Sequence, residues 1–290
     1  MVKQNTAVGF VGLGLMGLPM TLRLCSGKFN VSVWNRTEEK TSSALTAGAQ
    51  LADTRAQLAK VSDIIFLCLT DASAVEETLF GKDSLASNAS GKIIVDHSTI
   101  GPTAAKAFGE RLHSIHGVGY IDAPVTGGVL GATEGTLTVF AGGDANAVQL
   151  VRPVLSLLAR RVIHLGTHGA GQMAKLCNQV MIMNTFATMA EMIKLAENGG
   201  IDSSQIPNIF ADGFAASRVL EVFGKRMAIR SSETTGHLST ARKDLELILD
   251  AGKANATDLP MSNTAHQLVE RAIDGGLGSQ DITNLIQVYD

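Results

Sequence analysis

Three short stretches of the chain contain residues whose types and spacing are suited to chemistry on an anionic ligand. In the first, Gly12, Gly14 and Gly17 form the pattern G-x-G-x-x-G within GFVGLGLMGLPM. The second, residues 122–137, reads DAPVTGGVLGATEGTL, and the third, residues 169–179, reads GAGQMAKLCNQ. Backbone N–H groups of glycine-rich turns bind phosphate or carboxylate oxygens. A lysine side chain can exchange a proton with a reacting group.

The glycine pattern predicts a dinucleotide site, because it lies between an expected strand at 7–13 and an expected helix. Gly12 allows the tight turn, Gly14 lets the backbone approach a pyrophosphate, and Gly17 lets the helix and strand pack closely. The N-terminus of the helix directs partial positive charge at the phosphates. Four further residues are expected to line the same cofactor site: Leu15, Met16, Leu69 and Thr70.

The end of the second expected strand favours NADP over NAD, although NAD remains possible. NAD sites usually place an Asp or Glu there, to bind the ribose 2′-hydroxyl. Here the strand at 30–35 is followed by Arg36 and Thr37, with Asn35 as its last residue. Arg36 would attract a 2′-phosphate, and Asn35 and Thr37 can hydrogen-bond to it. The alternative is that Arg36 is a solvated charge in a loop.

The second stretch offers Thr126, Gly127 and Gly128, a hydroxyl followed by unobstructed backbone N–H groups. This combination is suited to holding a carboxylate. The alternative is a glycine-rich surface turn with no ligand.

The third stretch places Lys175 and Asn178 three residues apart, hence on one face of a helix, with Gln179 beside them. That helix is otherwise apolar. Either the lysine chain reaches along the helix to solvent, or Lys175 faces a cleft between domains. A partly desolvated lysine loses basicity and can exchange a proton near neutrality.

The elements that must position these residues predict two domains. Strands and helices alternate over residues 7–166, which is typical of a doubly wound, largely parallel sheet. Residues 170–198 then predict one long, mostly buried helix, and only helical segments follow. We therefore expect a Rossmann-type α/β domain over 1–167 and an all-α domain over 168–290, joined by the long helix.

Composition excludes several classes of function. The net charge is -3 and basic residues form no cluster, so nucleic acid is not expected as a partner. No apolar run is long enough to span a bilayer, and the first ten residues lack the core of a signal peptide. Three separated cysteines fit a reducing cytoplasm. No cluster of His, Asp and Glu suggests a metal.

Taken together, these motifs are similar to those of a known enzyme family. The sequence resembles the β-hydroxyacid dehydrogenases, the group that includes 3-hydroxyisobutyrate dehydrogenase and tartronate semialdehyde (2-hydroxy-3-oxopropionate) reductase. The resemblance covers nearly the whole chain, and the order and spacing of its motifs are more specific than any one of them. The motifs are GFVGLGLMGLPM, DHSTIGP at 96–102, DAPVTGG at 122–128, GAGQMAKLCNQ and RKDLELILDAG at 242–252.

The resemblance implies a role for several residues. It makes Lys175 the catalytic acid/base and the loop at 126–128 the substrate carboxylate site, and it places Thr99 and Lys243 against the cofactor. Asn178 and Gln179 are expected to bind the substrate, and Asn178 would orient the substrate or the lysine. Two departures stand out, because Thr126 replaces the usual Ser and Gln179 stands where many members have Asn.

The implied activity is hydride transfer between nicotinamide and a short β-hydroxy acid or its semialdehyde, in a homodimer or homotetramer assembled through the helical domain. Succinic semialdehyde or glyoxylate reduction by the same residues is an alternative, as is a non-catalytic NADP-binding module. The 6-phosphogluconate dehydrogenases share the architecture, but this chain is too short for their larger helical domain. Arg218 either extends into solvent or faces the cleft, where it would favour a substrate with a second carboxylate or a polar hydroxylated tail.

Overall fold

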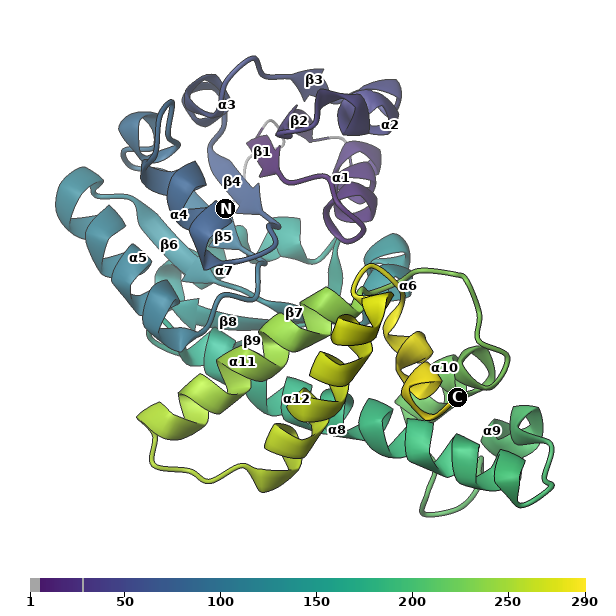
Figure 1. The fold of residues 1–290 in the computed structure, drawn as a ribbon. Coiled ribbons are helices and arrows are strands. Elements are labelled where there is room, and N and C mark those ends of the chain that lie inside the picture. Colours follow the sequence, from purple (N-terminus) through teal and green to yellow (C-terminus); the bar gives the residue numbers. More distant parts are fainter. Residues whose placement is uncertain (1–5, 28) are drawn as a thin grey trace. The chain divides into compact units, whose positions relative to one another are not determined.

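The structure is a computed structural model that describes residues 6–27 and 29–290 of the chain. It divides into two compact units, residues 1–175 and residues 176–290. The division falls inside one long helix, α8 (Ala170–Asn198), which belongs to both units (Figure 1). The domain boundary at 167/168 stays a prediction. The two compact units divide between residues 175 and 176, in the second turn of α8.

The first unit is built on a sheet of nine strands among the described residues, ordered β3-β2-β1-β4-β5-β6-β8-β7, with β9 paired to β8. The strands are β1 (Ala7–Val11), β2 (Asn30–Trp34), β3 (Gln50–Leu51), β4 (Ile64–Leu67), β5 (Ile93–Asp96), β6 (Gly119–Asp122), β7 (Val125–Thr126), β8 (Leu137–Gly143) and β9 (Ala159–Gly166). The strands from β3 to β6 are parallel, whereas β8 is antiparallel to β6 and β7. The carboxyl ends of the parallel strands meet at one edge, where such sheets bind ligands.

Helices cover both faces of this sheet. They are α1 (Gly17–Ser26), α2 (Ser42–Thr46), α3 (Arg55–Val61), α4 (Ala72–Phe80), α5 (Pro102–His116), α6 (Gly128–Glu134) and α7 (Ala145–Leu155). One hydrophobic core joins α1, α2, α6 and α7 to the sheet, and the other joins α3, α4 and α5 to its opposite face. Along β4, Phe66 packs into the first core, and Ile65 and Leu67 pack into the second. This alternation explains why the strands read as continuous apolar runs.

The second unit is helical among its residues 176–290. After α8 come α9 (Ile206–Ile209), α10 (Arg218–Ala228), α11 (Leu238–Ala254) and α12 (Pro260–Ala272), with short 3₁₀ segments at Ser203–Gln205 and Ile282–Tyr289. Apolar residues of α8, α10, α11 and α12 form one core that includes Ile193, Met227, Leu245 and Val269. None of the described helices combines the length and apolar character needed to cross a membrane.

The predicted fold class is confirmed: an α/β unit with a largely parallel sheet precedes a helical unit. Helices α6 and α7 were not predicted. Glycines enclose α6, whose first residue is Gly128 and whose C-cap is Gly135, so the stretch reads as a turn rather than a helix.

Candidate active site

The glycine-rich loop between β1 and α1 has the geometry that its spacing predicts. Gly12 has a φ of +97°, and a Cβ there would lie 2.3 Å from the carbonyl oxygen of Cys68. A Cβ on Gly17 would lie 1.8 Å from the carbonyl oxygen of Gly12. A Cβ on Gly14, by contrast, would meet no described atom within 4 Å. The first and last glycines are therefore needed for packing, and the space beside Gly14 is open, as a cradle for a pyrophosphate must be.

The loop after β2 braces this glycine-rich loop. The Oδ1 atom of Asn35 accepts a hydrogen bond from the N–H of Leu13 at 2.8 Å, and its Nδ2 donates to the carbonyl oxygen of Thr37 at 2.7 Å. Both ends of the Asn35 amide are thus engaged within the protein. Arg36 is exposed, and among the described residues its guanidinium has no hydrogen-bond or ion-pair partner.

The loops after β4 and β5 lie at the same edge of the sheet. The Leu69 side chain lies beside Gly12, and the Leu69 N–H donates to Ser98 Oγ at 2.8 Å. Thr70 is exposed next to it, and Thr99 follows Ser98 in a half-buried position. The structure therefore brings three of the predicted cofactor residues to the edge that holds the glycine-rich loop.

The Thr126-Gly127-Gly128 segment joins a strand to a helix. Thr126 ends β7, and α6 begins at Gly128. Gly127 has a φ of +132° and Gly128 a φ of +63°, values that residues other than glycine rarely adopt. A Cβ on Gly128 would meet no described atom within 4 Å, so the backbone is accessible there.

Lys175 lies in the second turn of α8, and only 8% of it is exposed. The start of this helix is capped from the sheet, because the carboxylate of Asp122 at the end of β6 accepts hydrogen bonds from the N–H groups of Gly169 at 2.8 Å and Gln172 at 3.0 Å. Burial raises the pKa of Asp122, and the two N–H donors lower it in part. The cap fixes the turn that precedes Lys175.

A second buried carboxylate, Asp96, ends β5. It accepts hydrogen bonds from the Ser98 N–H and the Tyr120 hydroxyl, both at 2.9 Å. Burial raises the pKa of Asp96 to about 6, and the same burial raises the pKa of Tyr120 well above its usual value. Burial lowers the pKa of the adjacent His97 to about 4, so the imidazole stacked on Phe66 is neutral at pH 7.

In the second unit, a chain of polar contacts links the predicted residues of α8 to those of α11. Asn178 Nδ2 donates to Gln179 Oε1 at 3.0 Å, and Gln179 Nε2 donates to Asp244 Oδ2 at 2.5 Å. The other oxygen of Asp244 lies 3.1 Å from Lys243 Nζ. Asp244 is buried, and it connects two predicted substrate residues to a predicted cofactor residue.

Of the two predicted alternatives for Arg218, its surroundings favour the one in which the side chain extends into solvent. It is the first residue of α10 and forms an ion pair with Glu221, and the two side chains are 68% and 66% exposed. This pairing favours a role as a solvated helix charge.

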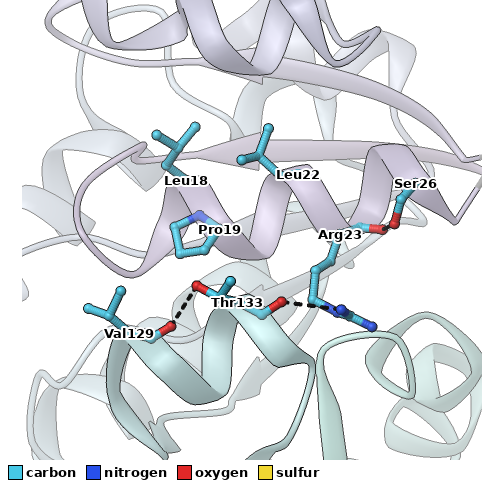
Figure 2. A pocket seen from close by; sticks show the side chains of 7 residues that line it. All are labelled: Leu18, Pro19, Leu22, Arg23, Ser26, Val129 and Thr133. Atoms are coloured by element: carbon cyan, nitrogen blue, oxygen red, sulfur yellow. Dashed lines mark hydrogen bonds between the residues drawn. The ribbon is translucent and has the colours of Figure 1, made fainter.

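A pocket of about 400 Å³ in the first unit is lined by none of these residues, although two of its lining residues, Leu18 and Val129, directly follow Gly17 and Gly128 in the chain. As Figure 2 shows, Pro19 of α1 faces Val129 and Thr133 of α6, and Leu18 precedes it on the same helix. None of the predicted site residues lines this pocket, so it is not the expected cofactor site.

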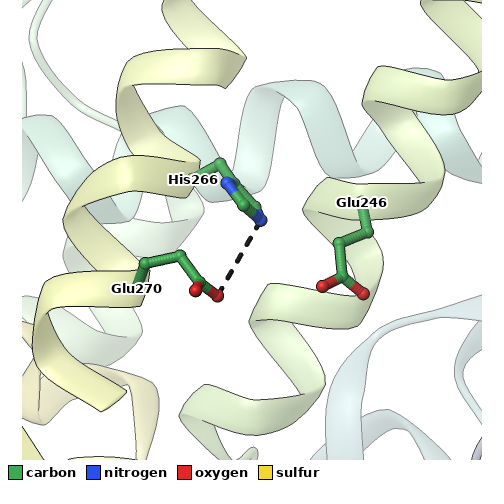
Figure 3. Close-up of side chains that lie close together, drawn as sticks. All are labelled: Glu246, His266 and Glu270. Atoms are coloured by element: carbon green, nitrogen blue, oxygen red, sulfur yellow. Dashed lines mark ion pairs between the residues drawn. The ribbon is translucent and has the colours of Figure 1, made fainter. Parts of the chain in front are cut away.

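One group of His and Glu side chains that the sequence did not reveal comes together in the second unit. Glu246 of α11 comes together with His266 and Glu270 of α12, and His266 Nε2 lies 3.9 Å from Glu270 Oε1 (Figure 3). The residues are distant in sequence, so spacing did not reveal them. The Arg242 guanidinium lies 3.8 Å from Glu246 and 3.7 Å from Glu270 and balances both carboxylates, so we interpret the cluster as an ion-pair network.

Sequence reasoning missed three buried polar residues that contact the segments of predicted site residues: Asp122 and Gln172 in the first unit and Asp244 in the second. Each lies within a motif quoted above, DAPVTGG, GAGQMAKLCNQ and RKDLELILDAG. Their burial is the signal that separates them from surface polar residues, and burial depends on the tertiary structure.

Comparisons with known proteins agree with this architecture. Residues 7–166 match the family model described as the NAD binding domain of 6-phosphogluconate dehydrogenase, and residues 169–289 match that described as the NAD-binding of NADP-dependent 3-hydroxyisobutyrate dehydrogenase. The chain is 34% identical to the 2-hydroxy-3-oxopropionate reductase of Escherichia coli (strain K12), over 98% of this chain and 97% of the relative.

Two solved structures have the same fold. One is the 3-hydroxyisobutyrate dehydrogenase of Salmonella typhimurium, with a TM-score of 0.91 and 26% identity over 98% of this chain and 100% of the other. The other is Psf3 in complex with NADP⁺ and 2-OPP, with a TM-score of 0.89 and 27% identity over 98% and 100% of the two chains. The chain therefore belongs to the β-hydroxyacid dehydrogenase family, NAD(P)-dependent enzymes that transfer a hydride between nicotinamide and a short β-hydroxy acid or its semialdehyde.

Proposed function

We propose that this enzyme uses NADP(H) to interconvert a three- or four-carbon β-hydroxy acid and its semialdehyde, of the 2-hydroxy-3-oxopropionate or 3-hydroxyisobutyrate type, with Lys175 as general acid and base. The observation that carries this proposal is the burial of Lys175 on an otherwise largely apolar helix, one turn after a capped N-terminus. A buried lysine without a function is uncommon, because desolvating an ammonium group is costly.

The residues of the first unit fit the cofactor. Gly12, Gly14 and Gly17 would hold its pyrophosphate, and Leu15, Met16, Leu69, Thr70 and Thr99 would line it; Lys243 is the cofactor residue proposed from the second unit. Exposed Arg36 supports NADP(H), because a guanidinium pairs well with a 2′-phosphate. Asn35 holds the loop of Arg36 and Thr37 against the glycine-rich loop. When bound, the nicotinamide supplies or accepts the hydride.

The remaining residues bind and protonate the substrate. Backbone N–H groups at Gly127 and Gly128, with the Thr126 hydroxyl, hold its carboxylate. Lys175 donates a proton to the carbonyl oxygen as the aldehyde becomes an alcohol, and it accepts the hydroxyl proton in the reverse direction. Asn178 and Gln179 orient the substrate, and the buried Asp244 holds Gln179 in place.

The test is the substitution Lys175→Ala. It should lower kcat by on the order of 10²-fold or more and leave the Kd for NADPH nearly unchanged. Turnover would be measured with tartronate, methylmalonate and succinic semialdehydes and with glyoxylate, so that the same assay distinguishes the alternative reductase activities. Near-normal turnover of the variant would exclude Lys175 from proton transfer.

We also infer a homodimer or homotetramer in a reducing cytoplasm. Met181 and Leu195 of α8 are 70% and 75% exposed, which is typical of side chains that a partner covers. Cys25 and Cys177 are free thiols, as expected of a protein in reducing surroundings. Light scattering during size-exclusion chromatography measures the assembly, and a monomeric mass would contradict this inference.

A further inference from the structure

Gln172 is wholly buried in the first turn of α8, and its side-chain amide makes three hydrogen bonds to one loop. Its Oε1 accepts from the N–H groups of Ile100 at 3.1 Å and Gly101 at 3.3 Å, and its Nε2 donates to the carbonyl oxygen of Ser98 at 2.8 Å. An amide side chain can make four such bonds, so Gln172 is nearly saturated by this loop alone. The three partners flank Thr99 on both sides.

The backbone of the same turn is held by the sheet. The Gln172 N–H donates to Asp122, and Gly171 packs so closely that a Cβ there would lie 2.3 Å from the carbonyl oxygen of Phe140. A Cβ on Gly169 would lie 2.9 Å from the carbonyl oxygen of Pro102. These contacts fix the position of the start of α8 and its rotation about the helix axis.

The network continues from the Thr99 loop to the loop after β4. Ser98 receives the Leu69 N–H on its Oγ at 2.8 Å, and its carbonyl oxygen receives Gln172 Nε2 at 2.8 Å. Lys175 follows Gln172 by three residues and therefore lies on the same face of α8. One chain of hydrogen bonds thus joins two loops of the cofactor edge to the helical turn before Lys175, all within the first unit.

We propose that Gln172 is a positioning residue for hydride transfer, which holds the Thr99 loop and Lys175 in a fixed relation without touching the substrate. The inference rests on the function proposed above. The physical reason is that hydride and proton must reach neighbouring atoms of one carbonyl group, and a misplacement of about 1 Å can cost about 10²-fold in rate. A glutamine fits this position because it both accepts from two N–H groups and donates to a carbonyl oxygen.

The experiment compares wild type with Gln172→Met, which keeps the length of the side chain and removes all three hydrogen bonds. Ser62→Ala is the control, because Ser62 is buried in the same unit at the amino end of β4 and donates to the Leu58 carbonyl oxygen at 2.7 Å. For each protein, kcat, KM, the Kd for NADPH and the isotope effect with NADPH deuterated at the transferred position are measured.

Gln172→Met should lower kcat by about 10-fold or more with a smaller change in KM, and it should raise the isotope effect because hydride transfer becomes slower than the other steps. Ser62→Ala should leave the isotope effect unchanged. A Gln172→Met enzyme with the wild-type isotope effect and kcat per active site would overturn the proposal. If this variant does not fold, Gln172→Glu decides in the same way, since it keeps the two accepted bonds and loses the donated one.

Lys175→Ala separates this proposal from the proposed function. If Lys175→Ala turns over normally, the assignment of the acid/base is wrong, and the positioning role built on it falls too. If Lys175→Ala is inactive while Gln172→Met matches wild type in kcat and isotope effect, the positioning role alone is wrong.

Discussion

Gly14 and Gly17, two glycines of the G-x-G-x-x-G pattern, should respond in opposite ways to the same added methyl group. A Cβ on Gly14 meets no described atom within 4 Å and the residue has no left-handed φ, so Gly14→Ala should fold as the wild type does. A Cβ on Gly17 would lie 1.8 Å from the Gly12 carbonyl oxygen, so Gly17→Ala must displace the backbone. Overpacking of this kind costs about 1–3 kcal/mol of folding stability.

Gly14→Ala should instead weaken the binding of the cofactor. Its methyl group would occupy the space where the pyrophosphate approaches the backbone. Loss of one hydrogen bond to a charged group costs about 1.5–3 kcal/mol, which corresponds to roughly a 10- to 150-fold rise in Kd. Gly14→Ala should therefore have this higher Kd for NADPH together with a wild-type free energy of unfolding.

Fluorescence titration with NADPH and urea unfolding of the apo-proteins measure the two quantities separately. Gly17→Ala is the matched control, since it is less stable than wild type before any cofactor is added. The reasoning fails if Gly14→Ala binds NADPH as tightly as wild type, or if it loses as much stability as Gly17→Ala does.

Two further predictions concern Arg36 and Asp96. Arg36→Ala should raise KM for NADPH by about 10- to 100-fold, the loss of one charge-assisted pair, and leave KM for NADH unchanged; equal effects on both cofactors would show that Arg36 does not contact a 2′-phosphate. For Asp96, whose pKa is raised to about 6, the unfolded chain releases its proton at lower pH than the folded protein does, so this group lowers folding stability as pH rises from about 4 to 6. The free energy of unfolding of Asp96→Asn minus that of wild type should therefore rise across that window, by up to about 3 kcal/mol, and stay constant above it. His97 titrates in both proteins, so its contribution cancels in this difference. Urea unfolding from about pH 4 to pH 7 measures the difference, and a pH-independent difference would contradict the assignment.

The glycine-rich loop was predictable because its requirements are local. Gly12 and Gly17 are separated by only four residues, and their roles follow from the chain between them. The strands of the parallel sheet were predictable for a similar reason, since burial on both faces produces short apolar runs such as Ile64–Leu67.

The polar contacts around α8 could not be predicted, because they join distant segments. Asp122 caps a helix that begins some 48 residues later, and Gln172 bonds to a loop more than 70 residues before it. Which strand end meets which helix depends on the order of strands in the sheet. The motif around Gln172 therefore indicated the lysine and left the partners of the glutamine unknown.

The contact between Asp122 and Gly142 has a consequence for how the sequence can diverge. A Cβ on Gly142 would lie 2.6 Å from Asp122 Oδ1, the atom that receives the Gly169 N–H. Alanine at 142 is therefore compatible with this helix start only if residue 122 becomes shorter, and a shorter residue 122 abandons the cap. The same Cβ would also lie 2.8 Å from the backbone nitrogen of Gly171, which no change at residue 122 removes, so position 142 should stay glycine in every sequence that keeps this helix start.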